Sequence, residues 1–156
     1  MALLKEHKWT PNNWSLKDKK IALVLRGALG VLFLYASVSK ALDPFEFSKI
    51  VYNYQILPEP LIYPVAAVLP YLEATIGLCL ILGIAKRGAA LLAFLSMVVF
   101  SLALMVNLFR GINVDCGCFD VEVRSVSQAR MYWYVLRDFT ILFWAFIVLR
   151  QSVLRE

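Results

Sequence analysis

Two long stretches of this chain carry almost no charge, and they limit the folds open to it more than any other feature. Residues 88–109 are 22 consecutive residues without a charge, and residues 61–85 are 25 residues with a single charge, Glu73. Since about 20 apolar residues in a helix cross the hydrocarbon core of a bilayer, each run is long enough to span a membrane. Residues 21–39 and 131–149 form two weaker runs that charged residues interrupt. The sequence therefore predicts an all-α membrane protein built as a bundle of four transmembrane helices.

The overall composition agrees with a membrane protein. Hydrophobic residues make up 61% of the 156 residues and charged residues 17%, which is less charge than a soluble domain of this length carries. We find no repeat and no low-complexity tract, so we expect one domain over residues 1–156. The run at 21–39 contains a charge and lacks a small-residue cleavage site after it, and we expect it to remain as an anchor. The net charge of +5 then reflects membrane orientation, and we expect no nucleic-acid partner.

Basic residues are distributed unequally between the two predicted sides of the membrane. Nine lie in the N-terminal tail, in the short loop after residue 85 and in the C-terminal tail, whereas five lie in residues 40–60 and 110–130. Because lysine and arginine are enriched on the cytoplasmic side, both termini are predicted to be cytoplasmic and the two longer loops to lie outside. In a bacterium this is the inner membrane, with the loops in the periplasm.

The first outer loop, residues 40–60, has the signals of a short helix. Asp43 can cap a helix whose first position is Pro44, and Pro58 and Pro60 end it before the next span. Its aromatic residues suit the interface between lipid and water. We expect either a packing segment against the membrane lipid or a lid or docking face for a partner or a lipid-soluble cofactor.

The second outer loop contains the sequence Cys116-Gly117-Cys118. A disulfide within so small a ring is strained, and strained, exposed disulfides exchange readily, so we predict that Cys116 and Cys118 are redox-active. Two alternatives remain open. In the first, the cysteines are structural or lipid-modified. In the second, they bind a metal, although zinc requires four ligands and the single histidine, His7, is predicted on the opposite side. Cys79 is expected to be a small packing residue within a span.

Ionisable residues inside the predicted spans are costly and are expected to be paired. Counted from the outer ends of their helices, Arg26 lies about 20 Å deep and Glu73 about 18 Å deep, which predicts a structural ion pair between them. Arg137 and Asp138 lie about 9–10 Å deep and are expected beneath the cysteine loop. They either lock the bundle together or form a polar site that binds a quinone or handles protons.

Several segments, taken in order, resemble the MauE/DoxX family of redox-associated membrane proteins, and the MauE branch in particular. They are "RGALGVLFLYASVSKALDP", "YNYQILP", "YLEATIGLCLILG", "DCGCFD" and "LRDFTIL". The resemblance implies a four-helix bundle linked to periplasmic disulfide formation or to maturation of a disulfide-rich dehydrogenase subunit, and DoxX-like relatives are linked to oxidation of sulfur compounds. The chain departs from the family at Asp120, where glycine is expected. The matching positions are Arg26, Lys40, Asp43, Pro44, Glu73, Cys116, Cys118 and Arg137.

These observations favour a thiol–disulfide redox protein that exchanges disulfides with a thioredoxin-like or maturing periplasmic partner. Its electrons would pass to or from membrane quinone, because an isolated dithiol needs an electron acceptor in the membrane to turn over. Two alternatives stand beside it: a non-catalytic scaffold for a periplasmic redox or sulfur-transfer protein, and a small-solute transporter that uses the buried charges. Whether the chain is an enzyme is left open.

Overall fold

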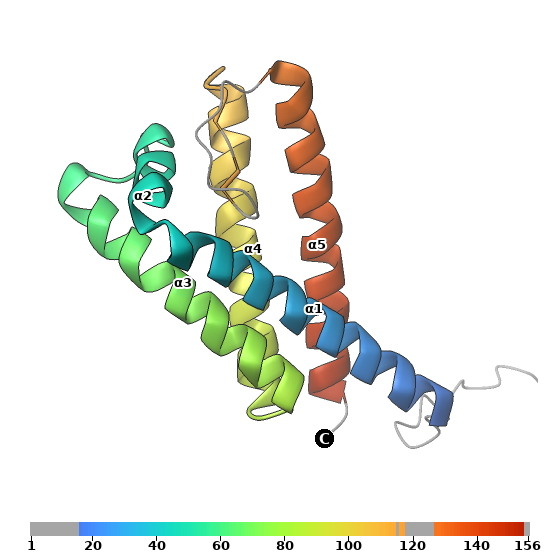
Figure 1. Ribbon diagram of the computed structural model, residues 1–156. Helices are drawn as coiled ribbons and strands as arrows, with labels where there is room; N and C mark the ends of the chain where they lie inside the picture. Colours follow the sequence, from blue (N-terminus) through green and yellow to red (C-terminus); the bar gives the residue numbers. More distant parts are fainter. Residues whose placement is uncertain (1–15, 115, 118–126, 155–156) are drawn as a thin grey trace, which may run out of the picture.

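The computed structural model describes residues 16–114, 116–117 and 127–154, and within them the chain is all-helical (Figure 1). Four of the helices are long and apolar enough to cross a membrane, which confirms the predicted fold class. The predicted spans 21–39, 61–85, 88–109 and 131–149 correspond to observed spans at 20–42, 59–82, 86–109 and 129–153. The helices are α1 (Leu16–Leu42), α2 (Pro44–Asn53), α3 (Glu59–Leu82), α4 (Lys86–Phe109) and α5 (Gln128–Leu154).

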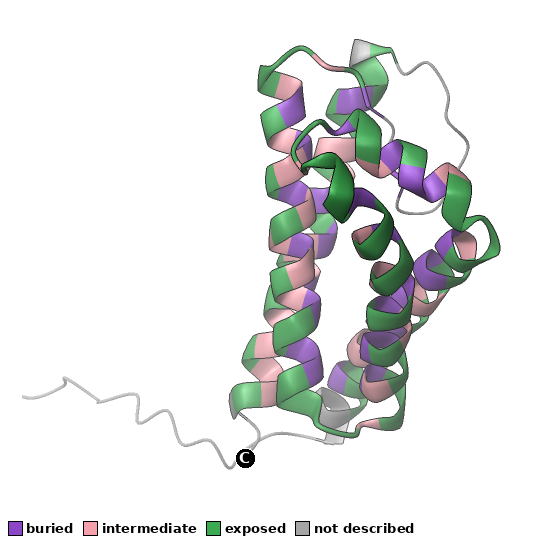
Figure 2. Cartoon of the chain, turned by 90° about the vertical axis from the view of Figure 1, so that its left-hand side faces the viewer, coloured by how far each residue is buried: buried purple, intermediate pink, exposed green. Residues whose placement is uncertain are grey.

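The four long helices direct most of their apolar residues away from the protein interior. In the most apolar window of each span, only 22–33% of the residues are buried inside the protein. Exposed faces run along the outside of every long helix (Figure 2), and they carry large hydrophobic side chains such as Val31, Tyr71, Val99 and Phe143. A continuous apolar exterior of this kind is suited to lipid and not to water.

The long helices pair as α1 with α3 and as α4 with α5, and the first pair crosses the second obliquely (Figure 1). Glycine permits the close approach of α1 and α3. A Cβ atom added to Gly30 would lie 2.8 Å from the backbone oxygen of Gly77, and one added to Gly77 would lie 2.8 Å from the oxygen of Gly30. Small residues let helix backbones pack closely within a membrane. The Ser37 hydroxyl adds a 2.7 Å hydrogen bond to the backbone oxygen of Pro70 across the same contact.

The short helix α2 forms as predicted. The Asp43 carboxylate accepts a 3.1 Å hydrogen bond from the backbone N–H of Glu46, and Pro44 occupies the first turn. Phe47 and Ile50 on its inner face are buried. The helix therefore closes one end of the bundle, which is called the α2 end below.

Buried apolar side chains form two clusters, one at each end of the bundle. The cluster away from α2 joins all four long helices around Leu29, Ile76, Ala93 and Ala145. The second cluster, the α2-end cluster, joins α2 to α3, α4, α5 and the segment after α4. Its buried members are Phe47, Ile50, Tyr54, Ala66, Leu104, Val114, Cys116 and Met131.

Candidate functional site

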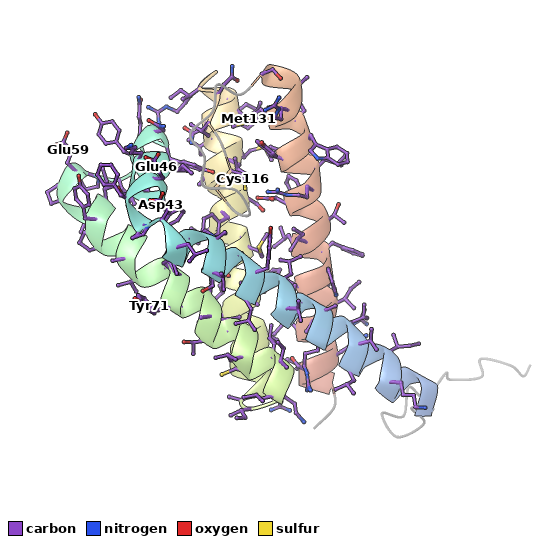
Figure 3. The ribbon with its side chains drawn as sticks, viewed as in Figure 1. Asp43, Glu46, Glu59, Tyr71, Cys116 and Met131 are labelled. Atoms are coloured by element: carbon purple, nitrogen blue, oxygen red, sulfur yellow. The ribbon has the colours of Figure 1, made fainter. Side chains whose placement is uncertain are left out.

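Cys116 belongs to the core of the α2 end. It is 4% exposed and packs with side chains of α2, α4 and α5 (Figure 3). Cys116 is disulfide-bonded, Cys79 is a free thiol, and Cys118 lies outside the described residues. The sulfur of Cys116 thus sits at the edge of the buried protein interior and not on an open loop.

Contacts with α2 fix the backbone around Cys116. The Tyr54 hydroxyl donates a 3.3 Å hydrogen bond to the Cys116 carbonyl. Gly117 has φ +63°, and a Cβ atom there would lie 2.9 Å from a methyl carbon of Ile50. Only glycine meets both conditions at low cost, because a left-handed backbone disfavours side chains and Ile50 leaves no room for one. Gly117 therefore lets the loop turn back against α2.

Arg137 of α5 contacts the sulfur of Cys116. Its Nη2 atom lies 2.8 Å from Cys116 Sγ and 2.9 Å from Asp138 Oδ1, and its Nε atom lies 3.2 Å from the same oxygen. The guanidinium also stacks 5.3 Å from the ring centre of Tyr134. Asp138 is 1% exposed, and its Oδ2 atom has no hydrogen-bond partner among the described residues. A cation thus stands beside the sulfur, and a buried carboxylate orients it.

The second buried ion pair differs from the predicted one. Glu73 pairs with Lys40, whose Nζ atom lies 2.8 Å and 3.0 Å from the two carboxylate oxygens, and both side chains are almost completely buried. Arg26 instead packs against Gly83 at the C-terminal end of α3. The predicted Arg26–Glu73 ion pair is therefore wrong.

The direction in which side chains lean explains the correct partner. Side chains on a helix tilt toward its N-terminus, and α1 and α3 are antiparallel. Lys40 consequently reaches back along α1, where its Nζ also donates to the Ala36 carbonyl at 3.3 Å, and Glu73 leans toward the α2 end to meet it. Arg26, like Lys40, leans toward the N-terminus of α1, which is away from Glu73 and toward the negative C-terminal end of the α3 dipole.

The two ion pairs approach each other in the middle of the bundle. Lys40, Glu73 and Asp138 line one small cavity of about 20 Å³, which is enough for a single water molecule. The formal charges of these three side chains and Arg137 cancel. A neutral set of four ionic groups, three buried and Arg137 partly exposed, therefore extends from the sulfur of Cys116 to Glu73. Lys40 is the member that the predicted ion pairs left out.

Cys116 also lines a larger apolar groove of about 400 Å³. It is formed by α2, α3 and α4, and none of its described lining residues carries a charge. Phe47 and Phe100 line this groove and also lie 5.5 Å and 5.8 Å from Lys40 Nζ, measured to their ring centres. Cys116 is thus placed between an uncharged groove and a buried ionic set. Among the described residues no three potential metal ligands of the His, Cys, Asp or Glu type gather.

Comparison with known proteins places this architecture in a family. The family model of "Methylamine utilisation protein MauE" matches residues 18–151. The chain is 36% identical to the methylamine utilization protein MauE of Paracoccus denitrificans. The 115 aligned residues make up 73% of this chain and 60% of the relative. The chain is 34% identical over 122 residues to the MauE of Methylorubrum extorquens, covering 78% and 63%. The matched part thus spans under two thirds of the length of these relatives.

No solved structure matches the chain. The family match runs from the first turn of α1 to the last turn of α5, and the similarity to curated relatives extends over about three quarters of the chain. The chain belongs to the MauE family of membrane proteins.

Proposed function

We propose that this protein is a thiol–disulfide redox protein of the bacterial inner membrane, in which Cys116 and Cys118 exchange a disulfide with a periplasmic thioredoxin-like or maturing partner. The setting is methylamine utilisation, for which its relatives are named. The distribution of basic residues supports cytoplasmic termini and a periplasmic α2 end.

The observation that carries the proposal is the 2.8 Å contact between Arg137 Nη2 and Cys116 Sγ. Disulfide exchange begins when a thiolate attacks one sulfur and releases the other as a thiolate. A guanidinium beside a sulfur favours its thiolate form. Because Cys116 is 4% exposed, the partner thiolate is expected to attack Cys118. Cys116 then leaves as a thiolate next to Arg137.

The exchange then proceeds in balanced steps. The first attack joins Cys118 to the partner through a mixed disulfide and frees Cys116. A second thiolate of the partner attacks this mixed disulfide, so that the partner leaves oxidised and this chain keeps two reduced cysteines. Restoring the Cys116–Cys118 disulfide removes two electrons and two protons. A membrane quinone accepts both when bound, and Arg137 and Asp138 hold charge and protons beside the sulfur.

One observation favours a second function, that of a non-catalytic membrane scaffold for a periplasmic redox or sulfur-transfer protein. Cys116 packs in a core cluster with Phe47, Ile50 and Met131, as the cysteine of a structural disulfide does. The scaffold function requires the cysteines only for stability, whereas the redox function requires them for turnover.

Single cysteine variants separate the two functions. The Cys116→Ser variant is expected to accumulate a mixed disulfide through Cys118, visible as a reducible shift on a non-reducing gel, and Cys118→Ser is expected to accumulate far less. The double variant is the control and gives no shift. In a strain that lacks the native copy, loss of complementation by a double variant that is present in the membrane at the wild-type level supports the redox function. Full complementation by the double variant overturns it and leaves the scaffold.

A further inference from the structure

We propose that the groove between α2, α3 and α4 binds the ring and the first isoprenoid units of a membrane quinone, with the ring against Cys116. This inference rests on the proposed redox function and assigns its electron acceptor to a site. The predicted cofactor residues Arg137 and Asp138 then act beside the sulfur from α5, which contributes none of the residues that line the groove.

The groove connects the lipid to the sulfur. Its mouth lies between α3 and α4, where the lining residues Leu72, Leu95 and Val99 are 38%, 48% and 66% exposed on the membrane face. Its inner end is lined by Cys116 and by Phe47 of α2. A ligand that diffuses in the bilayer can therefore reach the disulfide without passing through water.

The chemistry of the lining selects the ligand class. Tyr54, Ser96 and Cys116 bring the polar side-chain atoms of the groove, and the other lining residues are apolar. An uncharged ring with an isoprenoid tail matches this lining, whereas a phospholipid head group would bring charge into a site that offers no counter-charge. The volume of about 400 Å³ lies within the usual range for small-molecule sites. A lipid acyl chain would fit the groove but would accept no electrons from the cysteines.

The reaction at this site balances. The Cys116 thiolate and the Cys118 thiol form the S–S bond and give up two electrons and two protons in total, counting the proton that Cys116 has already released. The quinone takes up the same electrons and protons and becomes the hydroquinone. Arg137 holds Cys116 as a thiolate next to the groove until the bond forms.

A tryptophan in the groove tests the site. Ala103 lines the groove, and Ala103→Trp would fill part of it. The neighbouring Leu102 is 59% exposed and is not among the lining residues, so Leu102→Trp is the matched control. The probe is a photoreactive azido-benzoquinone with one isoprenoid unit, added to the full-length protein in lipid nanodiscs. Wild type and Leu102→Trp are expected to be labelled on α2, α3 or α4. Ala103→Trp should be labelled about tenfold less, because the indole would occupy volume that the ring needs; a tenfold loss of affinity corresponds to about 1.4 kcal/mol of binding free energy.

A second measurement follows the oxidation of the two cysteines by quinone instead of quinone binding. The fully reduced protein is mixed with the short-chain quinone, and the loss of free thiols is followed by mass after alkylation. Val99→Trp at the exposed mouth is the second variant, in case Ala103→Trp does not fold. We expect both groove variants to slow oxidation about tenfold relative to Leu102→Trp.

The outcomes separate the site from the function. Equal labelling and equal oxidation rates in the groove and control variants overturn the groove site, as does displacement of the probe by phospholipid but not by unlabelled quinone. The cysteines would still cycle with a protein partner in either case, so the proposed function would stand. Failure of the reduced wild type to be oxidised by any quinone overturns the acceptor and the site together.

Discussion

Arg137 and Cys116 are 21 residues apart in the sequence, yet the Arg137 Nη2 atom lies 2.8 Å from the Cys116 sulfur. The contact joins the segment after α4 to α5 and places a cation beside the sulfur that would leave during disulfide exchange. Four predictions follow from this contact and from the packing that surrounds it.

Replacing Arg137 should slow the chemistry of Cys116 without unfolding the protein. In a Cys118→Ser background, alkylation of Cys116 is expected to require higher pH in Arg137→Gln than with Arg137 present, because the cation favours the thiolate. Arg137→Lys keeps the charge but loses the planar fork that reaches both the sulfur and Asp138, so its pH profile should be intermediate. The measurement is the alkylation rate against pH. Identical profiles in all three proteins would show that the contact has no chemical effect.

Removing one member of the buried Lys40–Glu73 pair should be strongly destabilising. Lys40→Met leaves the Glu73 carboxylate buried without its partner, and we expect the free energy of unfolding in detergent to fall by about 3–5 kcal/mol. The double variant Lys40→Met/Glu73→Met should lose less than the sum of the single variants. Arg26→Met is the control and should show no coupling to Glu73. Coupling of Arg26 to Glu73 of similar size would contradict the observed pairing.

The crossing of α1 and α3 depends on Gly30. Gly30→Ala places a Cβ atom 2.8 Å from the Gly77 backbone oxygen, and overpacking of this kind typically costs about 1–3 kcal/mol. Gly27 lies one turn away on α1, where a Cβ atom would meet no described atom within 4 Å. Gly27→Ala should therefore be neutral or slightly stabilising, since alanine favours helix. Thermal unfolding of both variants in the same detergent makes the comparison, and equal melting temperatures would argue against a tight crossing.

Gly117→Ala should displace the cysteine segment from α2. The alanine must adopt a left-handed backbone conformation, which lowers stability by roughly 1–2 kcal/mol, and its Cβ atom also clashes with Ile50. Gly111 has φ +69° and no described atom within 4 Å of an added Cβ, so Gly111→Ala carries the backbone strain alone. We expect Gly117→Ala to be the less stable of the two and its Cys116 to be alkylated faster after reduction than Cys116 of Gly111→Ala. Unchanged alkylation would mean that Ile50 does not hold the segment.

The sequence predicted the fold because the fold depends on local composition. Runs such as residues 88–109 need only length and the absence of charge to indicate a span. Asp43 and Pro44 indicate the start of α2 for an equally local reason, since a cap and the first turn are set by neighbouring residues.

The site was only partly predictable, because its contacts depend on how helices pack. The depth of each backbone position along its helix puts Arg26 level with Glu73. That depth does not include the direction in which each side chain leans, and the side chains therefore end at different levels. Lys40 stands at the end of an apolar run and was counted as an outer charge, although it is 1% exposed. The groove is a product of three helices and has no signal in any one segment.

The redox state and location of the two cysteines in the membrane test the proposed disulfide exchange most sharply. Intact cells that express the Cys79→Ser variant, in which Cys116 and Cys118 are the remaining cysteines, are treated with a membrane-impermeant alkylating reagent before and after addition of a reductant. A cycling periplasmic disulfide predicts that Cys116 and Cys118 are protected before reduction and that label appears on this pair only after it. Labelling of both cysteines before reduction would show that they do not rest as a disulfide and would overturn the proposed exchange.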